Sequence, residues 1–179
     1  MRKKILFIAG MMACSSLAGA QEISKTWVAD KGNGTYQNPV LHADYSDPDV
    51  CAAGDDFYMT ASSFNCIPGI PILHSNDLVN WSLVNYALPV QEPEEFFDKA
   101  QHGKGVWAPA IRFHNGEFYI YWGDPDYGIY MIKTKDPKGK WSKPVLVKAG
   151  KGMIDATPLW DEDGKVYLIH AYAGSRSGV

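Results

Sequence analysis

The chain has 179 residues and a formal net charge of −3, with 46% hydrophobic and 21% charged residues. A mildly acidic chain without basic clusters lacks the positive stripe that nucleic-acid binding requires, so a nucleic-acid partner is excluded. Aromatic residues make up 13% of the chain and include six Trp and ten Tyr, a content that favours a neutral ligand such as a sugar.

The first twenty residues are predicted to be a removable export signal. Residues 2–4 are basic, residues 5–12 are apolar, and residues 18–20 (Ala-Gly-Ala) have the small side chains of a cleavage site. The apolar stretch is too short to span a bilayer, and no later segment is expected to span one. The protein is therefore expected to be periplasmic or secreted, and lipid attachment at Cys14 is the less favoured alternative. Cleavage leaves 14 basic against 20 acidic residues, a net charge of −6.

After a polar lead-in at residues 21–36, residues 37–179 are predicted to form one all-β region. Short β-rich runs alternate there with the Gly, Asn and Asp residues that tight hairpins need. The expected strands are 49–53, 57–63, 70–75 and 81–88, then 110–113, 117–122, 128–133 and 143–147, and finally 158–160 and 165–172. Only the connection 89–106 has a weak helical pattern, at 92–100, and loops of this length are usually functional.

An eight-residue hairpin pattern occurs three times, at residues 51–58, 112–119 and 160–167. The first two copies are followed by an Asp and then a Trp-Ser pair, and Trp81 and Trp141 lie 60 positions apart. Four short antiparallel strands in a period of this length are typical of β-propeller blades. A β-sandwich is the simplest alternative, but it gives no reason why the Asp and the Trp-Ser pair should recur at the end of each unit. A ring of about five blades needs roughly 300 residues, so the chain is expected to be an N-terminal fragment of about two and a half blades.

The functional residues are expected at the start of each repeat. The inner strands of a propeller lie beside its axis, so the residues before them should gather at one mouth of the central channel. Aligning the repeats places Asp47 at the first start, and Trp107 and Ala108 at the middle start. Asp155 falls at the third start, one position before the position that aligns with Asp47. Two carboxylates and an indole are suited to glycoside hydrolysis, which needs an activated water, a proton donor and an apolar surface for the sugar. The alternative for both aspartates is a structural role in a turn, as is expected of Asp49 within its strand.

The tryptophans divide by whether they recur with the repeat. Trp81 and Trp141 occupy the same position in two repeats and are predicted to pack in the interior. No other repeat has a Trp at the position of Trp107, which favours a role in the pocket. The pattern does not decide between pocket and core for Trp122 and Trp160, and the core is the favoured position.

Neither a metal site nor a disulfide is predicted. The five His residues form no closely spaced pair, so no metal-ligand pattern is present. Cys51 and Cys66 remain after processing, and we expect both to be small buried hydrophobic residues rather than a disulfide.

The strongest motifs are Asn-Pro-Val-Leu at 38–41, Asp-Pro-Asp-Val at 47–50, Ser-Ser-Phe at 62–64, Pro-Gly-Ile-Pro at 68–71 and Trp-Ala-Pro at 107–109. Together they resemble glycoside hydrolase family 43, over residues from about 36 to 179. The resemblance implies a five-bladed β-propeller that acts without a cofactor as an inverting β-xylosidase or α-L-arabinofuranosidase on plant-wall polysaccharides or oligosaccharides. The Pro-Gly-Ile-Pro stretch is most similar to the β-xylosidase-type members.

The resemblance also implies roles for individual residues. Asp47 would be the general base, and Asp155 the carboxylate that raises the pKa of the general acid and orients it. Phe64, Trp107 and Ala108 would line the subsite for the non-reducing sugar. The family's general acid is a Glu of a later blade, and no Glu here has the matching context, so the fragment alone is expected to be inactive. A retaining fructan hydrolase and a non-catalytic carbohydrate-binding propeller are the alternatives.

Overall fold

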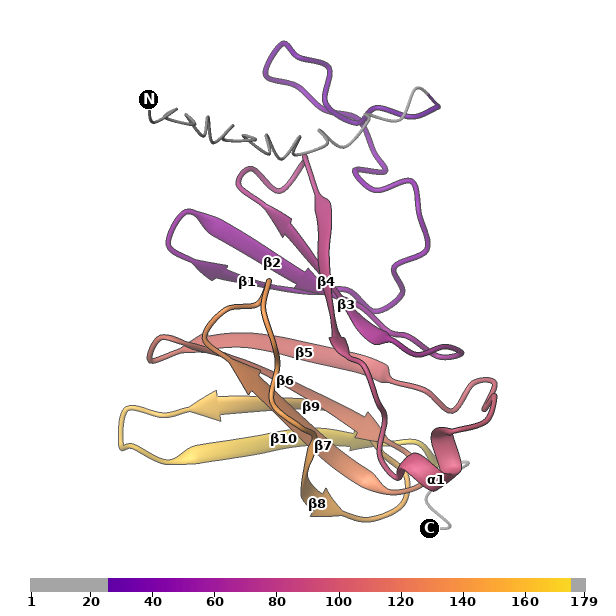
Figure 1. Ribbon diagram of the computed structural model, residues 1–179. Coiled ribbons are helices and arrows are strands. Elements are labelled where there is room, and N and C mark those ends of the chain that lie inside the picture. The colour runs from indigo at the N-terminus through magenta and orange to yellow at the C-terminus, as the bar shows by residue number, and fades with distance from the viewer. Residues whose placement is uncertain (1–25, 175–179) are drawn as a thin grey trace, which may run out of the picture.

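Three antiparallel β-sheets follow one another along the chain in the computed structural model, which describes residues 26–174 (Figure 1). The export signal expected at 1–20, with the alternative at Cys14, lies outside these residues. The first sheet contains β1 (Asp49–Ala53), β2 (Asp56–Thr60), β3 (Gly69–Ser75) and β4 (Ser82–Leu88). The second contains β5 (Trp107–His114), β6 (Glu117–Asp124), β7 (Gly128–Thr134) and β8 (Val145–Ala149). The third contains β9 (Met153–Trp160) and β10 (Val166–Tyr172), and the single short helix of the described residues is α1 (Glu94–Phe97).

The sheets are arranged as successive blades. Each of the first two has its four strands in chain order, as expected for a propeller blade rather than for a sandwich. The first strands of the three sheets lie side by side, since β5 contacts both β1 and β9 (Figure 1). This arrangement brings the three repeat starts to one region of the molecule, as the repeat pattern predicts.

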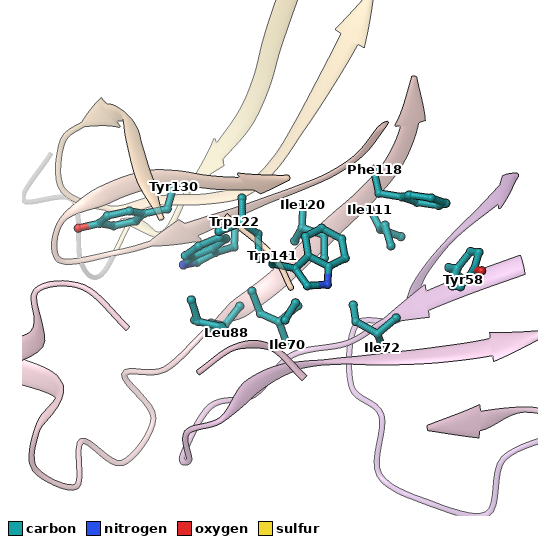
Figure 2. Packing of buried hydrophobic residues seen from close by; sticks show 13 residues of the cluster. Tyr58, Ile70, Ile72, Leu88, Ile111, Phe118, Ile120, Trp122, Tyr130 and Trp141 are labelled. Atoms are coloured by element: carbon teal, nitrogen blue, oxygen red, sulfur yellow. The ribbon is translucent and has the colours of Figure 1, made fainter. Parts of the chain in front are cut away.

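The main core lies between the first two sheets. Ile70, Ile72 and Leu88 of the first sheet face Ile111 and Ile120 of the second (Figure 2), and all five are fully buried. Fully burying a side chain of this size contributes about 1.5–3 kcal/mol. This contact therefore stabilises the position of one blade relative to the next.

The tryptophans follow the predicted division in part. Trp122 and Trp141 belong to the core, with Trp122 stacked on Tyr130 at a ring-centroid distance of 5.6 Å. Trp81 is only half-buried and donates its indole N–H to the Leu78 carbonyl at 3.0 Å, so its expected interior position is wrong. Trp160 is also half-buried and stacks on His114 at a centroid distance of 4.5 Å, so the core position favoured for it is wrong.

Strands β8 and β10 leave large apolar side chains exposed. In β10, Val166 and Ile169 are each 54% exposed, and in β8 Val145 is 51% exposed. Exposed apolar side chains on the edge strands of the sheets are expected where the described residues form only part of a ring of blades.

Candidate active site

The three repeat starts share an unusual backbone conformation. Asp47, Ala108 and Asp155 have positive φ angles of 51°, 33° and 54°. This left-handed region is uncommon for residues other than glycine, and such residues concentrate at functional sites. Its recurrence at each start indicates that these three residues occupy equivalent positions in the three blades.

This equivalence corrects the sequence alignment of the third repeat. Cys51 pairs with Tyr58 in the first hairpin, whereas Leu159, and not Trp160, pairs with Tyr167 in the third. The third hairpin therefore has one residue more between its paired positions, and counting back from the tyrosine misplaces the strand by one residue. Asp155 is equivalent to Asp47, rather than one position before it.

Residues of all three starts line one cavity of about 260 Å³. Asp47 and Asp155 are both exposed there, and Ala108 lies on the blade between them. The lining residues are Asp47, Pro48, Asp49, Ala108, Pro109, Ala110, Arg112, Asp155, Ala156 and Thr157. The cavity thus combines three carboxylates and one guanidinium with small side chains, and Asp47 and Asp155 are the two carboxylates that are not paired with Arg112.

Two serines hold the Asp47 carboxylate. The Ser62 hydroxyl donates to Oδ2 of Asp47 at 2.7 Å, and the neighbouring Ser46 hydroxyl donates to the same oxygen at 3.1 Å. Ser62 also accepts a hydrogen bond from the backbone N–H of Ala108 at 2.9 Å. The carboxylate of the first blade is therefore linked through one hydroxyl to the start of the second blade.

Phe64 and Trp107 are not among the residues that line this cavity. Trp107 directly precedes the lining residue Ala108, whereas Phe64 lines a second cavity of about 280 Å³. Their rings meet edge to face at a centroid distance of 6.0 Å. The Trp107 indole N–H donates to the Gly103 carbonyl at 3.0 Å, which fixes the ring against the 89–106 connection. The structure thus places the predicted site residues in two adjacent groups. A bridge between Ser63 and Val106 joins the segments that carry them.

An Asp49–Arg112 ion pair completes the cavity wall. Asp49 accepts hydrogen bonds from the Arg112 guanidinium and from the backbone N–H of Ile111, the latter at 2.7 Å. These bonds agree with the structural role expected of Asp49. Sequence reasoning missed Arg112, although one signal was present: the equivalent position of the other repeats holds Cys51 or Leu159.

Cys51 and Cys66, the two cysteines within residues 26–174, are free. Cys51 packs against the core, and burial raises the pKa of its thiol to about 12. Cys66 is exposed, so its expected burial is wrong, because it lies in the loop between β2 and β3. Residues 26–174 contain no group of three His, Cys, Asp or Glu side chains that could hold a metal ion.

The 89–106 connection contacts a buried carboxylate of the second sheet. Asp124, at the end of β6, is only 2% exposed and accepts hydrogen bonds from the backbone N–H groups of Asp126 (2.9 Å) and Tyr127 (3.2 Å). The side-chain amide of Gln91, which belongs to the connection, lies 3.4 Å from the other carboxylate oxygen. Burial disfavours the charged form and raises the pKa of Asp124 to about 6.

The buried Asp124 predicts that the free energy of unfolding falls as the pH rises from about 4 to about 6. In this interval the folded protein keeps a proton that the unfolded chain, with an ordinary pKa of 3.8, releases. Below the unfolded pKa, the protonated Asp124 contributes its full share to the free energy of unfolding. As the pH rises through the folded pKa, roughly 3 kcal/mol of that free energy is lost. Denaturant unfolding at pH 4 and pH 7 should show this loss in the wild type and in the control Asp44→Asn, but not in Asp124→Asn. An unchanged pH dependence in Asp124→Asn would contradict the assignment.

No helix within residues 26–174 is long and apolar enough to cross a membrane.

Comparisons with known proteins agree on one family. The family model for glycosyl hydrolases family 43 matches residues 36–178. A β-xylosidase from Formosa agariphila is 35% identical over 187 aligned positions, which cover 96% of this chain and 31% of the relative. A non-reducing-end α-L-arabinofuranosidase from Bacteroides ovatus is 37% identical, with 75% of this chain and 26% of the relative covered. The crystal structure of a mutant family-43 protein from Bacillus licheniformis matches with a TM-score of 0.66 at 35% identity, over 76% of this chain and 29% of that one. The chain thus spans about a quarter to a third of the length of these proteins.

Proposed function

Because the chain belongs to glycosyl hydrolase family 43, we propose that the full-length protein hydrolyses O-glycosidic bonds in plant-wall polysaccharides or their oligosaccharides. The described sheets form part of the family's five-bladed β-propeller. The observation that carries the proposal is the shared cavity, where Asp47 and Asp155 come from two different blade starts. The relatives favour xylose or arabinose as the sugar released.

Asp47 is proposed as the general base of an inverting reaction. Its carboxylate takes a proton from a water molecule while that water attacks the anomeric carbon, on the face opposite the leaving group. The bond from the anomeric carbon to the leaving oxygen breaks, and that oxygen receives a proton from a carboxylic acid roughly 6.5–9.5 Å from the base. No Glu of residues 26–174 lines the cavity, so the acid is proposed to come from a part of the family's domain that this chain does not span.

Asp155 is proposed to keep that acid protonated and oriented. A negative charge near a carboxylic acid disfavours the loss of its proton, which raises its pKa toward the working pH. Phe64 and Trp107 are proposed to form the apolar side of the sugar subsite, with Ala108 between them and the two carboxylates. Their edge-to-face contact supports this role, because it holds the two rings together directly before Ala108, which lines the cavity.

Export is part of the proposal. Residues 1–20 have a basic, then an apolar, then a small-residue segment, as a secretory signal does. A periplasmic or secreted enzyme would meet plant-wall fragments outside the cytoplasm.

The experiment that tests the function is hydrolysis of aryl glycosides by the full-length protein, followed by proton NMR. We expect an aryl β-D-xyloside or an aryl α-L-arabinofuranoside to be cleaved, and the sugar first formed to have the inverted anomeric configuration. Retained configuration would favour the alternative of a retaining fructan-type hydrolase. Sugar binding without cleavage of any glycoside would favour a non-catalytic propeller.

A further inference from the structure

We infer that Ser62 is a positioning residue, whose hydroxyl holds the Asp47 carboxylate so that one defined oxygen faces the reacting water. The inference rests on the proposed function of Asp47 and extends it to a residue outside the cavity lining. Ser62 follows β2 and the fully buried Ala61, and its backbone N–H donates to the Ser46 carbonyl at 2.9 Å. The position of its main chain is therefore fixed.

The direction of the Ser62 hydroxyl proton follows from its two partners. The backbone N–H of Ala108 can only donate, so at 2.9 Å it occupies an acceptor site on the Ser62 oxygen. The other partner, Asp47 Oδ2 at 2.7 Å, can only accept when the carboxylate is ionised. The single hydroxyl proton must then point at Asp47. A hydroxyl held from both sides in this way cannot rotate freely.

The arrangement distinguishes the two oxygens of Asp47. Oδ2 receives both serine hydroxyls, whereas no side chain or backbone group in the described part of the chain donates to Oδ1. Oδ1 is then the oxygen available to take a proton from water. Without Ser62, only the longer Ser46 bond would restrain the carboxylate, and rotation about the Cβ–Cγ bond would exchange the two oxygens.

Ser62 also couples two blades. It belongs to the first sheet's segment, while Ala108 belongs to the second sheet, and both Asp47 and Ala108 have strained positive φ angles. One hydroxyl thus sets the position of the proposed base relative to the backbone beside the proposed sugar subsite. Small misplacements of reacting groups reduce rates steeply, by up to roughly 10²-fold for 1 Å.

The next residue provides a matched control. Ser63 also accepts a backbone N–H, that of Ile70 at 3.0 Å, but both of these residues belong to the first blade and neither donates a hydrogen bond to Asp47. Ser62→Ala and Ser63→Ala therefore remove similar hydrogen bonds to backbone. Only the Ser62 variant loses the contact with the carboxylate.

The test measures kcat and KM of full-length Ser62→Ala, Ser63→Ala and Asp47→Asn, and of the double variant Ser62→Ala/Asp47→Asn, on the best aryl glycoside. We expect Ser62→Ala to lower kcat roughly 10–100-fold with KM changed by less than about 3-fold, and Ser63→Ala to stay near wild type. In the Asp47→Asn background, Ser62→Ala should cause little further loss, because the group that it positions is already absent. Should Ser62→Ala fail to fold, Ser62→Cys, with a weak thiol donor, is expected to lose kcat in the same way.

Two outcomes would overturn the inference. One is equal kcat values for the Ser62 and Ser63 variants, and the other is a full additional loss from Ser62→Ala in the Asp47→Asn background. Both require an active wild-type protein. A wild type that hydrolyses no glycoside would instead overturn the proposed function itself, so the two failures are distinguishable.

Discussion

Replacing Asp47 with Asn in the full-length protein should lower kcat by roughly 10²–10⁴-fold, the usual contribution of a general base. Asn has nearly the shape of Asp and keeps an oxygen that can accept the Ser62 and Ser46 hydrogen bonds, so folding should be preserved. It cannot take a proton from water at neutral pH, and that step is the one expected to fail. Steady-state kinetics with the aryl glycoside measures the loss.

The control for Asp47→Asn is Asp44→Asn. Asp44 is an exposed carboxylate on the same segment that does not line the cavity. Both variants remove one negative charge from this region, but only one removes the proposed base. Turnover by Asp47→Asn at the level of Asp44→Asn would remove Asp47 from the role.

The second large effect is expected from Asp155→Asn. Removing this charge should lower the pKa of the general acid, because the nearby negative charge no longer disfavours loss of its proton. The acid is then deprotonated at a lower pH, so the basic limb of the kcat/KM profile should move to lower pH. At neutral pH we expect kcat to fall on the order of 10²-fold.

A pH–rate profile from about pH 4 to pH 9 tests this prediction. Loss of activity with the basic limb unmoved would show that Asp155 acts in another way, for example by holding the backbone of its blade. An unchanged rate would show that it has no part in the reaction.

The repeat and its local turns made much of the fold predictable. The first expected strand, 49–53, coincides with β1, because the Gly-Asp turn after it defines the hairpin locally. Boundaries were less accurate for the first strands of the second and third sheets. Strand β9 begins at Met153 rather than at 158, and β5 begins at Trp107 rather than at 110. Their first residues pair irregularly with the neighbouring strand, and such bulges carry no local sequence signal.

The convergence of the three repeat starts at one cavity was predictable from the sequence, but the hydrogen bonds that connect them were not. Asp47, Asp155 and Ala108 could be found because the pattern recurs, and a ring brings recurring positions together. The extra residue in the third hairpin shifted Asp155 by one position, which only the strand register reveals. The links from Ser62 to Asp47 and to Ala108 span 15 and 46 residues, and contacts of this range depend on how the blades pack.

The most direct measurement of the central claim is chemical rescue of full-length Asp47→Ala with sodium azide. An azide ion needs no base to activate it and can enter from the side that the lost carboxylate occupied. We predict restored cleavage of the aryl glycoside and, by NMR, a glycosyl azide of inverted anomeric configuration. A glycosyl azide of retained configuration, or wild-type turnover without azide, would contradict the assignment of Asp47 as the base.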